Sequence, residues 1–196
     1  MNEAKRRFLL KDRIIKGIHK EGHFKVSVVK TTKLVEEARK RHQLSPLAAI
    51  YLGKAMTATM LLASELKGEE RLQLRIDANG PLQQIMVEAN KNGEIRGYVA
   101  QPQASIDPTT QQLEDGLGIG LLQVEKVLYN KAKPKTSTVE LKASDITTDI
   151  AFYLQQSEQI ASFLNIDLDF DEDGSIRQIG GILIQMLPDA PDHVYL

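Results

Sequence analysis

The sequence contains no cysteine. Structural disulfides, thiolate catalysis and cysteine-ligated zinc are therefore excluded within these 196 residues. Tryptophan is also absent, and five Phe and five Tyr provide little material for a carbohydrate platform or a base-stacking surface. The 25 basic and 26 acidic residues give a net charge of −1, which offers no general argument for nucleic acid or an anionic membrane as a partner.

A long apolar run is missing from the amino-terminal segment. MNEAKRRF is charged and LLKDRIIKG is mixed, so no signal peptide is predicted and a cytoplasmic protein is expected. A chain of this length can bury a hydrophobic core without cross-links. We expect one domain over residues 1–188, followed by a short, poorly ordered tail over residues 189–196.

The most apolar stretch, Ser45–Gly68, is predicted to form a central helix. Its first residue is a suitable N-cap, Pro46 suits the first helical position, and its final glycine suits a left-handed C-cap. Apolar side chains surround it on nearly all sides, which predicts burial on nearly all sides. The length would suffice for a membrane span, but Lys54 within the stretch and Glu65 near its end favour a buried core helix.

Sequence periodicity places the other elements. Residues 12–30 form a predicted hairpin with its turn at Glu21-Gly22, and Ile14, Val26 and Val28 alternate with polar neighbours as in a half-buried strand. Further elements are a helix capped by Thr31-Thr32, a meander over 71–101, a loop over 101–115, strands within 116–130 and 137–141, a helix capped by Ser144 and a hairpin over 161–187. Antiparallel hairpins with helices between them predict an α+β fold, its helices packed on the sheets.

Two motifs resemble ligand loops but fit structural roles better. Residues 169–174 have the acids and the glycine of half a calcium loop. Position twelve is Gly180 instead of glutamate, so we interpret the motif as a solvated hairpin turn with Gly174 at positive φ. Glycines alternate with other residues at Gly116, Gly118 and Gly120. A dinucleotide-binding loop follows a strand and precedes a helix, which these glycines do not. We interpret them as a bent strand or bulge.

No catalytic constellation is recognised, since GxSxG, HExxH and kinase motifs are absent. The histidines are His19, His23, His42 and His193. His19 and His23 flank a turn and could approach each other, but we interpret them as solvated strand-end residues. The basic clusters Lys5-Arg6-Arg7-Lys11-Arg13 and Lys131-Lys133-Lys135 are interpreted as solvated surface. We predict no catalytic, cofactor-binding or metal-binding residue, and a binding protein instead of an enzyme.

Runs distributed over about residues 12–188 form a joint pattern. They are Thr32–Ala38, Arg41-His42, Ser45–Ala48, Leu52–Ala55, Leu66–Gly68, Asn79–Leu82, Asn92–Val99, Tyr153–Gln159 and Gly180–Pro188. In this order and at these spacings the chain resembles the thirty-three-kilodalton chaperonin family, the redox-regulated heat-shock holdase of bacteria. Small departures are the variation at Asp77-Ala78-Asn79 and Gln83, where the family usually has glycine.

The resemblance implies an amino-terminal substrate-binding domain that forms a homodimer and holds unfolded or misfolded client proteins without ATP during the stress response. The family continues with a helical linker and a four-cysteine zinc domain, neither of which is in this sequence. The resemblance therefore carries over neither zinc nor a redox switch, and the sequence corresponds to a truncated or a naturally switch-less form. No client-contacting residue is assigned. Flexible methionine side chains could adapt to varied clients if they were exposed. We expect core positions for the four candidates, which are Met56, Met60, Met86 and Met186.

Two other functional classes stay open. One is a partner-dependent module whose apolar face is covered by a single specific protein. The other is a small-molecule or metal-binding enzyme, for which a closed pocket with convergent polar groups, or an acid pair of strongly shifted pKa, would be evidence. Exposed apolar surface would favour the holdase or the module.

Overall fold

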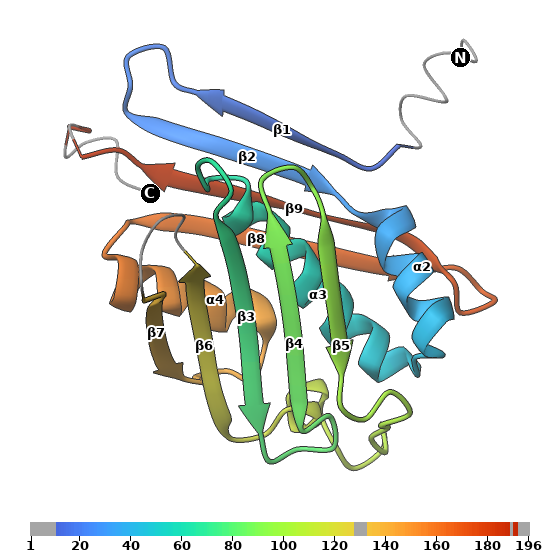
Figure 1. Cartoon of the computed structure of the whole chain (residues 1–196). Coiled ribbons are helices and arrows are strands. Elements are labelled where there is room, and N and C mark those ends of the chain that lie inside the picture. The colour runs from blue at the N-terminus through green and yellow to red at the C-terminus, as the bar shows by residue number, and fades with distance from the viewer. Residues whose placement is uncertain (1–10, 128–132, 189, 192–196) are drawn as a thin grey trace, which may run out of the picture.

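The computed structural model describes residues 11–127, 133–188, 190 and 191. The sequence interpretations of Lys5-Arg6-Arg7, Lys131, His193 and most of the tail over 189–196 lie outside the described residues. Within the described part, the chain forms two antiparallel sheets with helices between them (Figure 1). This arrangement confirms the predicted α+β class.

The first sheet, sheet A, brings together the predicted first and last hairpins. Its strand order is β1-β2-β9-β8, with every neighbouring pair antiparallel. The strands are β1 (Arg13–Ile18), β2 (Phe24–Lys30), β8 (Ser162–Phe170) and β9 (Ile176–Met186). Both hairpin predictions are confirmed, and both predicted turn glycines adopt positive φ, 76° at Gly22 and 78° at Gly174. The turn over 169–174 is therefore a hairpin turn, in which Asp169 pairs with Arg177.

The second sheet, sheet B, contains the predicted meander and the two strands after it. Its order is β5-β4-β3-β6-β7. The strands are β3 (Arg71–Ala78), β4 (Gln84–Asn90), β5 (Ile95–Val99), β6 (Gly120–Val127) and β7 (Lys135–Glu140). Leu72, Leu74 and Ile76 are fully buried on one face, as their alternation with polar residues predicts.

The central helix α3 (Pro46–Ala63) lies between the two sheets (Figure 1). All its residues are buried except Pro46, Ile50 and Lys54, and Lys54 pairs with Asp145 at 3.0 Å. Its 18 residues and mean hydropathy of 1.3 would allow a membrane span, but 83% of the helix is buried inside the protein. It is therefore the core helix that its composition predicts.

The end of α3 differs from the prediction. The helix stops at Ala63 with Ser64 as its C-cap, and Gly68 adopts its left-handed conformation (φ 53°) only in the turn that follows. The Ser64 hydroxyl donates to the Leu61 carbonyl at 2.7 Å, and Glu65 turns toward sheet A. Side-chain contacts, not the glycine, therefore end this helix.

The N-cap position of helix α2 (Thr32–His42) is Thr31, as predicted, but its side chain makes no capping hydrogen bond. The Thr31 hydroxyl instead shares a buried 2.7 Å hydrogen bond with Thr57 of α3. Asp12 accepts the backbone N–H of Leu34 at 2.8 Å and so satisfies a free donor of the first turn. The segment before β1 is thereby tied to the start of α2.

Helix α4 (Ile146–Tyr153), which continues as the π-helical turn η2 (Leu154–Glu158), is capped by Asp145, and the prediction of Ser144 is wrong by one residue. Asp145 accepts the Thr148 N–H at 3.0 Å. Ser144 is left-handed (φ 53°) and donates its hydroxyl to the Gly118 carbonyl at 2.5 Å. That contact removes it from the capping position.

The interpretation of Gly116, Gly118 and Gly120 as a bent strand or bulge is also wrong. β6 pairs with β3 without a register shift from Gly120 to Val127, and Gly116 ends the short 3-10 helix η1 (Leu113–Gly116). The glycines permit close backbone approach instead: a Cβ on Gly120 would lie 2.4 Å from the Asp77 carbonyl oxygen.

Gly120→Ala is expected to lower the free energy of unfolding by about 2 kcal/mol, because the added methyl overlaps backbone atoms that cannot rotate away. Urea denaturation followed by circular dichroism measures the change. Gly17→Ala is the matched control, since a Cβ at this strand glycine meets nothing within 4 Å. Equal stability of the two variants would contradict the argument.

Candidate functional site

Strand β2 turns Val26 and Val28 away from the core, whereas its Val29 is buried in the core. The sequence predicts that Val26 and Val28 belong to a half-buried strand. The apolar side of such a strand normally faces the core. In the structure Val28 is exposed and Val26 half-buried, whereas the intervening Ser27 is 3% exposed. The alternation is correct, but its direction is opposite to the usual one.

Six outward apolar residues of sheet A form one patch, which we call the apolar face. Register places them in two rows across the strands. The first row is Ile15, Val28 and Ile182, and the second contains Val26, Ile184 and Phe163. Ile15, Val28 and Phe163 are 56%, 39% and 47% exposed. A contiguous apolar patch of this kind is typical of an interaction surface.

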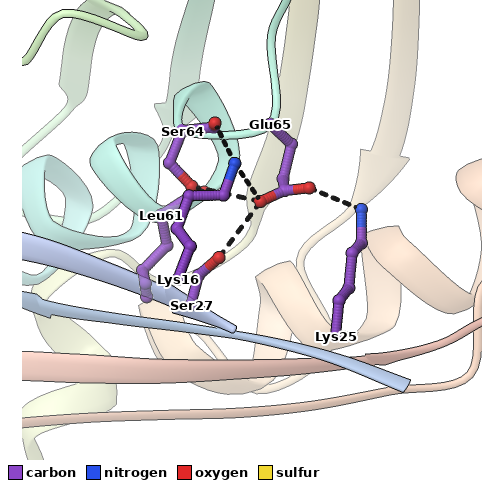
Figure 2. Close-up of polar contacts among 6 residues, drawn as sticks. All are labelled: Lys16, Lys25, Ser27, Leu61, Ser64 and Glu65. Carbon is purple, nitrogen blue, oxygen red and sulfur yellow. Dashed lines mark hydrogen bonds and ion pairs between the residues drawn. The ribbon is translucent and has the colours of Figure 1, made fainter. Parts of the chain in front are cut away.

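Beneath this face, three polar residues of the β1–β2 hairpin point inward and surround Glu65 (Figure 2). Lys25 Nζ lies 2.6 Å from Glu65 Oε2, and Lys16 Nζ lies 2.9 Å from Glu65 Oε1. The Ser27 hydroxyl donates to Oε1 at 3.1 Å, and Lys16 also donates to the Ser64 carbonyl at 2.6 Å. We call Lys16, Lys25, Ser27, Ser64 and Glu65 the Glu65 cluster.

The Glu65 cluster explains why the valines point outward. Burial alone would raise the pKa of Glu65, but hydrogen bonds from Lys25 and Lys16 outweigh it and lower the pKa from 4.5 to about 2. A one-residue slip of β2 would turn Lys25 and Ser27 to the other face. That slip would remove two of the partners of a half-buried carboxylate. The cluster therefore fixes the register that exposes the apolar face.

A second carboxylate, Glu158, lies in the same interior region. It accepts the Tyr153 hydroxyl at 2.6 Å and pairs with Lys126 at 2.9 Å. Burial raises the pKa of Glu158, but these hydrogen bonds outweigh burial and lower it. A carboxylate held ionised in this way is not matched to proton transfer near neutral pH.

The cavity bordered by both carboxylates is small. Its volume is about 140 Å³, and Lys25, Glu65, Tyr153, Glu158 and Gln185 are among its lining residues. Sites for drug-sized ligands usually occupy roughly 300–1,000 Å³. This cavity and its paired charges therefore fit a structural polar interior better than a binding site for a drug-sized ligand.

The predicted site residues are distributed as follows. Met56, Met60 and Met186 are buried, as expected, and Met86 is half-buried on sheet B, away from the apolar face. His42 is exposed on α2. His19 and His23 do approach each other, with ring centroids 4.9 Å apart. The apolar face itself was not predicted from the sequence. Its signal is the alternation of Phe24, Val26 and Val28 with Lys25 and Ser27.

A family model described as Hsp33 protein matches residues 12–195. The chain belongs to the Hsp33 family. The resemblance inferred from the sequence runs is thereby confirmed. The Hsp33 match covers both sheets and the helices between them, and so includes the apolar face and the Glu65 cluster.

Individual Hsp33 relatives agree with this assignment. The "33 kDa chaperonin" of Desulforamulus reducens is 39% identical over 188 residues, and that of Carboxydothermus hydrogenoformans is 41% identical over 189 residues. Each alignment covers 94% of this chain but only 64% and 65% of the relative. The chain thus spans about two thirds of the length of these curated relatives.

A solved Hsp33 structure has the same fold. The crystal structure of the 33 kDa chaperonin (heat shock protein 33 homolog) from Thermotoga maritima matches with a TM-score of 0.82 and 33% identity. The match covers 88% of this chain and 60% of that one. The two-sheet arrangement around a central helix is therefore an Hsp33 fold.

Proposed function

We propose that this chain is an ATP-independent holdase that binds unfolding proteins through the apolar face of sheet A and prevents their aggregation. The observation that carries the proposal is the pair of outward apolar rows on sheet A, above the inward polar residues of the Glu65 cluster. Relatives of the chain are named chaperonins, which supports client binding over the partner-dependent alternative.

The physical basis of binding is burial of apolar area. Each Å² removed from water contributes about 25 cal/mol, without requiring a particular client sequence. Branched and aromatic side chains on a sheet face suit varied apolar segments. These 196 residues contain no GK[ST] phosphate loop, so the proposal is holding, not ATP-driven refolding.

Assembly and location are part of the same proposal. We propose a homodimer of cytoplasmic chains, each with a single core domain over residues 1–188, acting on misfolded proteins during heat stress. Nucleic acid and membranes are not proposed as partners, and no catalytic activity is proposed. Light scattering coupled to size exclusion tests the dimer directly, since a chain of 21.9 kDa would elute with twice that mass.

Holdase activity of these residues is expected to be insensitive to thiol oxidants, because no cysteine is present. The test is light scattering of a thermally unfolding client with and without the chain, in dithiothreitol and again in peroxide. We expect equal suppression in both conditions. Mass spectrometry controls for methionine oxidation, which peroxide also causes. Absence of suppression in both conditions would contradict the holdase and favour a module with one specific partner.

A further inference from the structure

The turn between β1 and β2 brings three possible metal ligands together. His19 and Phe24 close the hairpin, with the His19 N–H donating to the Phe24 carbonyl at 2.9 Å, and the Gly22 N–H donates back to the His19 carbonyl at 2.8 Å. This tight turn holds Glu21 and His23 beside His19. The sequence is His-Lys-Glu-Gly-His over residues 19–23.

The ligand atoms of this group are already close. One donor atom each from His19, Glu21 and His23 lies within 4.8 Å of the others. His23 Nε2 is 3.7 Å from Glu21 Oε2. The His19 ring stacks on Phe24, with centroids 4.8 Å apart and an interplanar angle of 15°, so this imidazole is held in place by packing.

A second observation also indicates a ligand. His19 Nδ1 is buried and has no hydrogen-bond partner among the described residues. Buried polar atoms are nearly always satisfied, and an exception requires an explanation such as an ion or an ordered water. The side chain of Glu21 is 72% exposed and that of His23 18% exposed, so an ion has access to the group from solvent.

We propose that the β1–β2 turn binds a divalent transition metal of the zinc type through His19, Glu21 and His23. Two imidazole nitrogens and one carboxylate oxygen form a donor set that suits Zn²⁺, with the fourth tetrahedral position open to water. The donors contain no sulfur, so thiol oxidants leave the site intact. This site is independent of the proposed holdase activity.

The location gives the metal a mechanical role. Phe24 stacks on His19 and is the cross-strand partner of Met186 in β9. In the alternation of β2, Phe24 shares the outer side of sheet A with Val26. The His23 carbonyl accepts the Leu187 N–H at 2.9 Å, so the turn is also tied to the end of β9. A bound ion would cross-link the hairpin at one end of the apolar face and stiffen that end.

The test is isothermal titration of Zn²⁺ alone into tag-free chain that has been treated with a chelator and then freed of it. We expect one ion per chain, with affinity lowered at least about tenfold by His23→Gln or Glu21→Gln. His42→Gln is the matched control because this histidine is exposed on α2, and its affinity should equal that of the wild type. Absence of binding, or equal affinity in His23→Gln and His42→Gln, would overturn the site.

A second measurement covers the case in which a turn variant fails to fold. Histidine ring resonances of the wild-type chain are followed by NMR during the Zn²⁺ titration. The resonances of His19 and His23 should shift together and saturate at one equivalent, while that of His42 stays unchanged. Shifts confined to other histidines would overturn the proposal.

Discussion

Changing Ile15 to lysine and Val28 to glutamate together is expected to weaken suppression of client aggregation about 30-fold. Each substitution removes an apolar contact worth about 1 kcal/mol, and a total of about 2 kcal/mol corresponds to that factor in affinity. The two residues are direct cross-strand partners, so the opposite charges pair with each other and the net charge of the chain is unchanged. The measurement is the chain concentration that halves light scattering by a thermally unfolding client.

The matched control is Ile119→Lys with Val127→Glu. These residues are 81% and 45% exposed, more than Ile15 and Val28. They lie in sheet B, where Ile119 precedes β6 and Val127 is its last residue. The control should suppress aggregation as the wild type does. If both double variants lose activity equally, general surface hydrophobicity, and not the apolar face, is responsible for client binding.

Glu65→Gln is expected to lower the free energy of unfolding by about 3 kcal/mol at pH 7, since a fall in pKa from 4.5 to about 2 corresponds to about that energy. The side chain is 23% exposed, so solvent screens the ion pairs only in part. The variant leaves Lys16 and Lys25 facing a neutral amide. Urea denaturation at a series of pH values measures the difference from the wild type.

The pH dependence of this difference has a definite sign. The pKa of Glu65 is lower in the folded state than in the unfolded state. The contribution of its carboxylate to stability is therefore complete above about pH 4.5 and is lost as the pH falls toward about 2. The stability difference between wild type and Glu65→Gln should therefore shrink over that range. Glu69→Gln, on the exposed loop after α3, is the control and should leave stability nearly unchanged. A difference that persists undiminished at pH 2 would contradict the ion-pair explanation.

Local patterns in the sequence are sufficient to predict most elements of this fold. Both hairpins of sheet A and the meander of sheet B follow from alternation and turn glycines such as Gly22 and Gly174. The buried helix follows from apolar residues on all its sides. These signals are contained within each segment, which explains why they are readable without the structure.

The direction of the β2 face could not be predicted in the same way. Alternation shows that Val26 and Val28 share a side, but not which side faces the core. That choice depends on Glu65, which is distant in sequence and whose carboxylate gathers Lys16 and Lys25 inward. The candidate site was missed because its determinant is a tertiary ion pair.

The errors at helix ends have two origins. Gly68 and Ser144 are good local signals for a C-cap and an N-cap, but Ser64 and Asp145 occupy those positions. Ser144 is engaged by the Gly118 carbonyl, a partner remote in sequence. The Ser64 hydroxyl instead bonds to the nearby Leu61 carbonyl, a local contact that competes with the glycine signal.

The pairing of β2 with β9 also determines when the apolar face can form during translation. The apolar face is assembled from strands far apart in the sequence, since Phe24 pairs with Met186. At roughly 5–20 residues per second, the ribosome needs on the order of 10 s to make the intervening chain. During that interval β2 has its hairpin partner β1 but no β9, and the two outward rows are incomplete. A nascent chain therefore acquires the complete face only after β9 has been translated, and before that point it does not present the face to its neighbours.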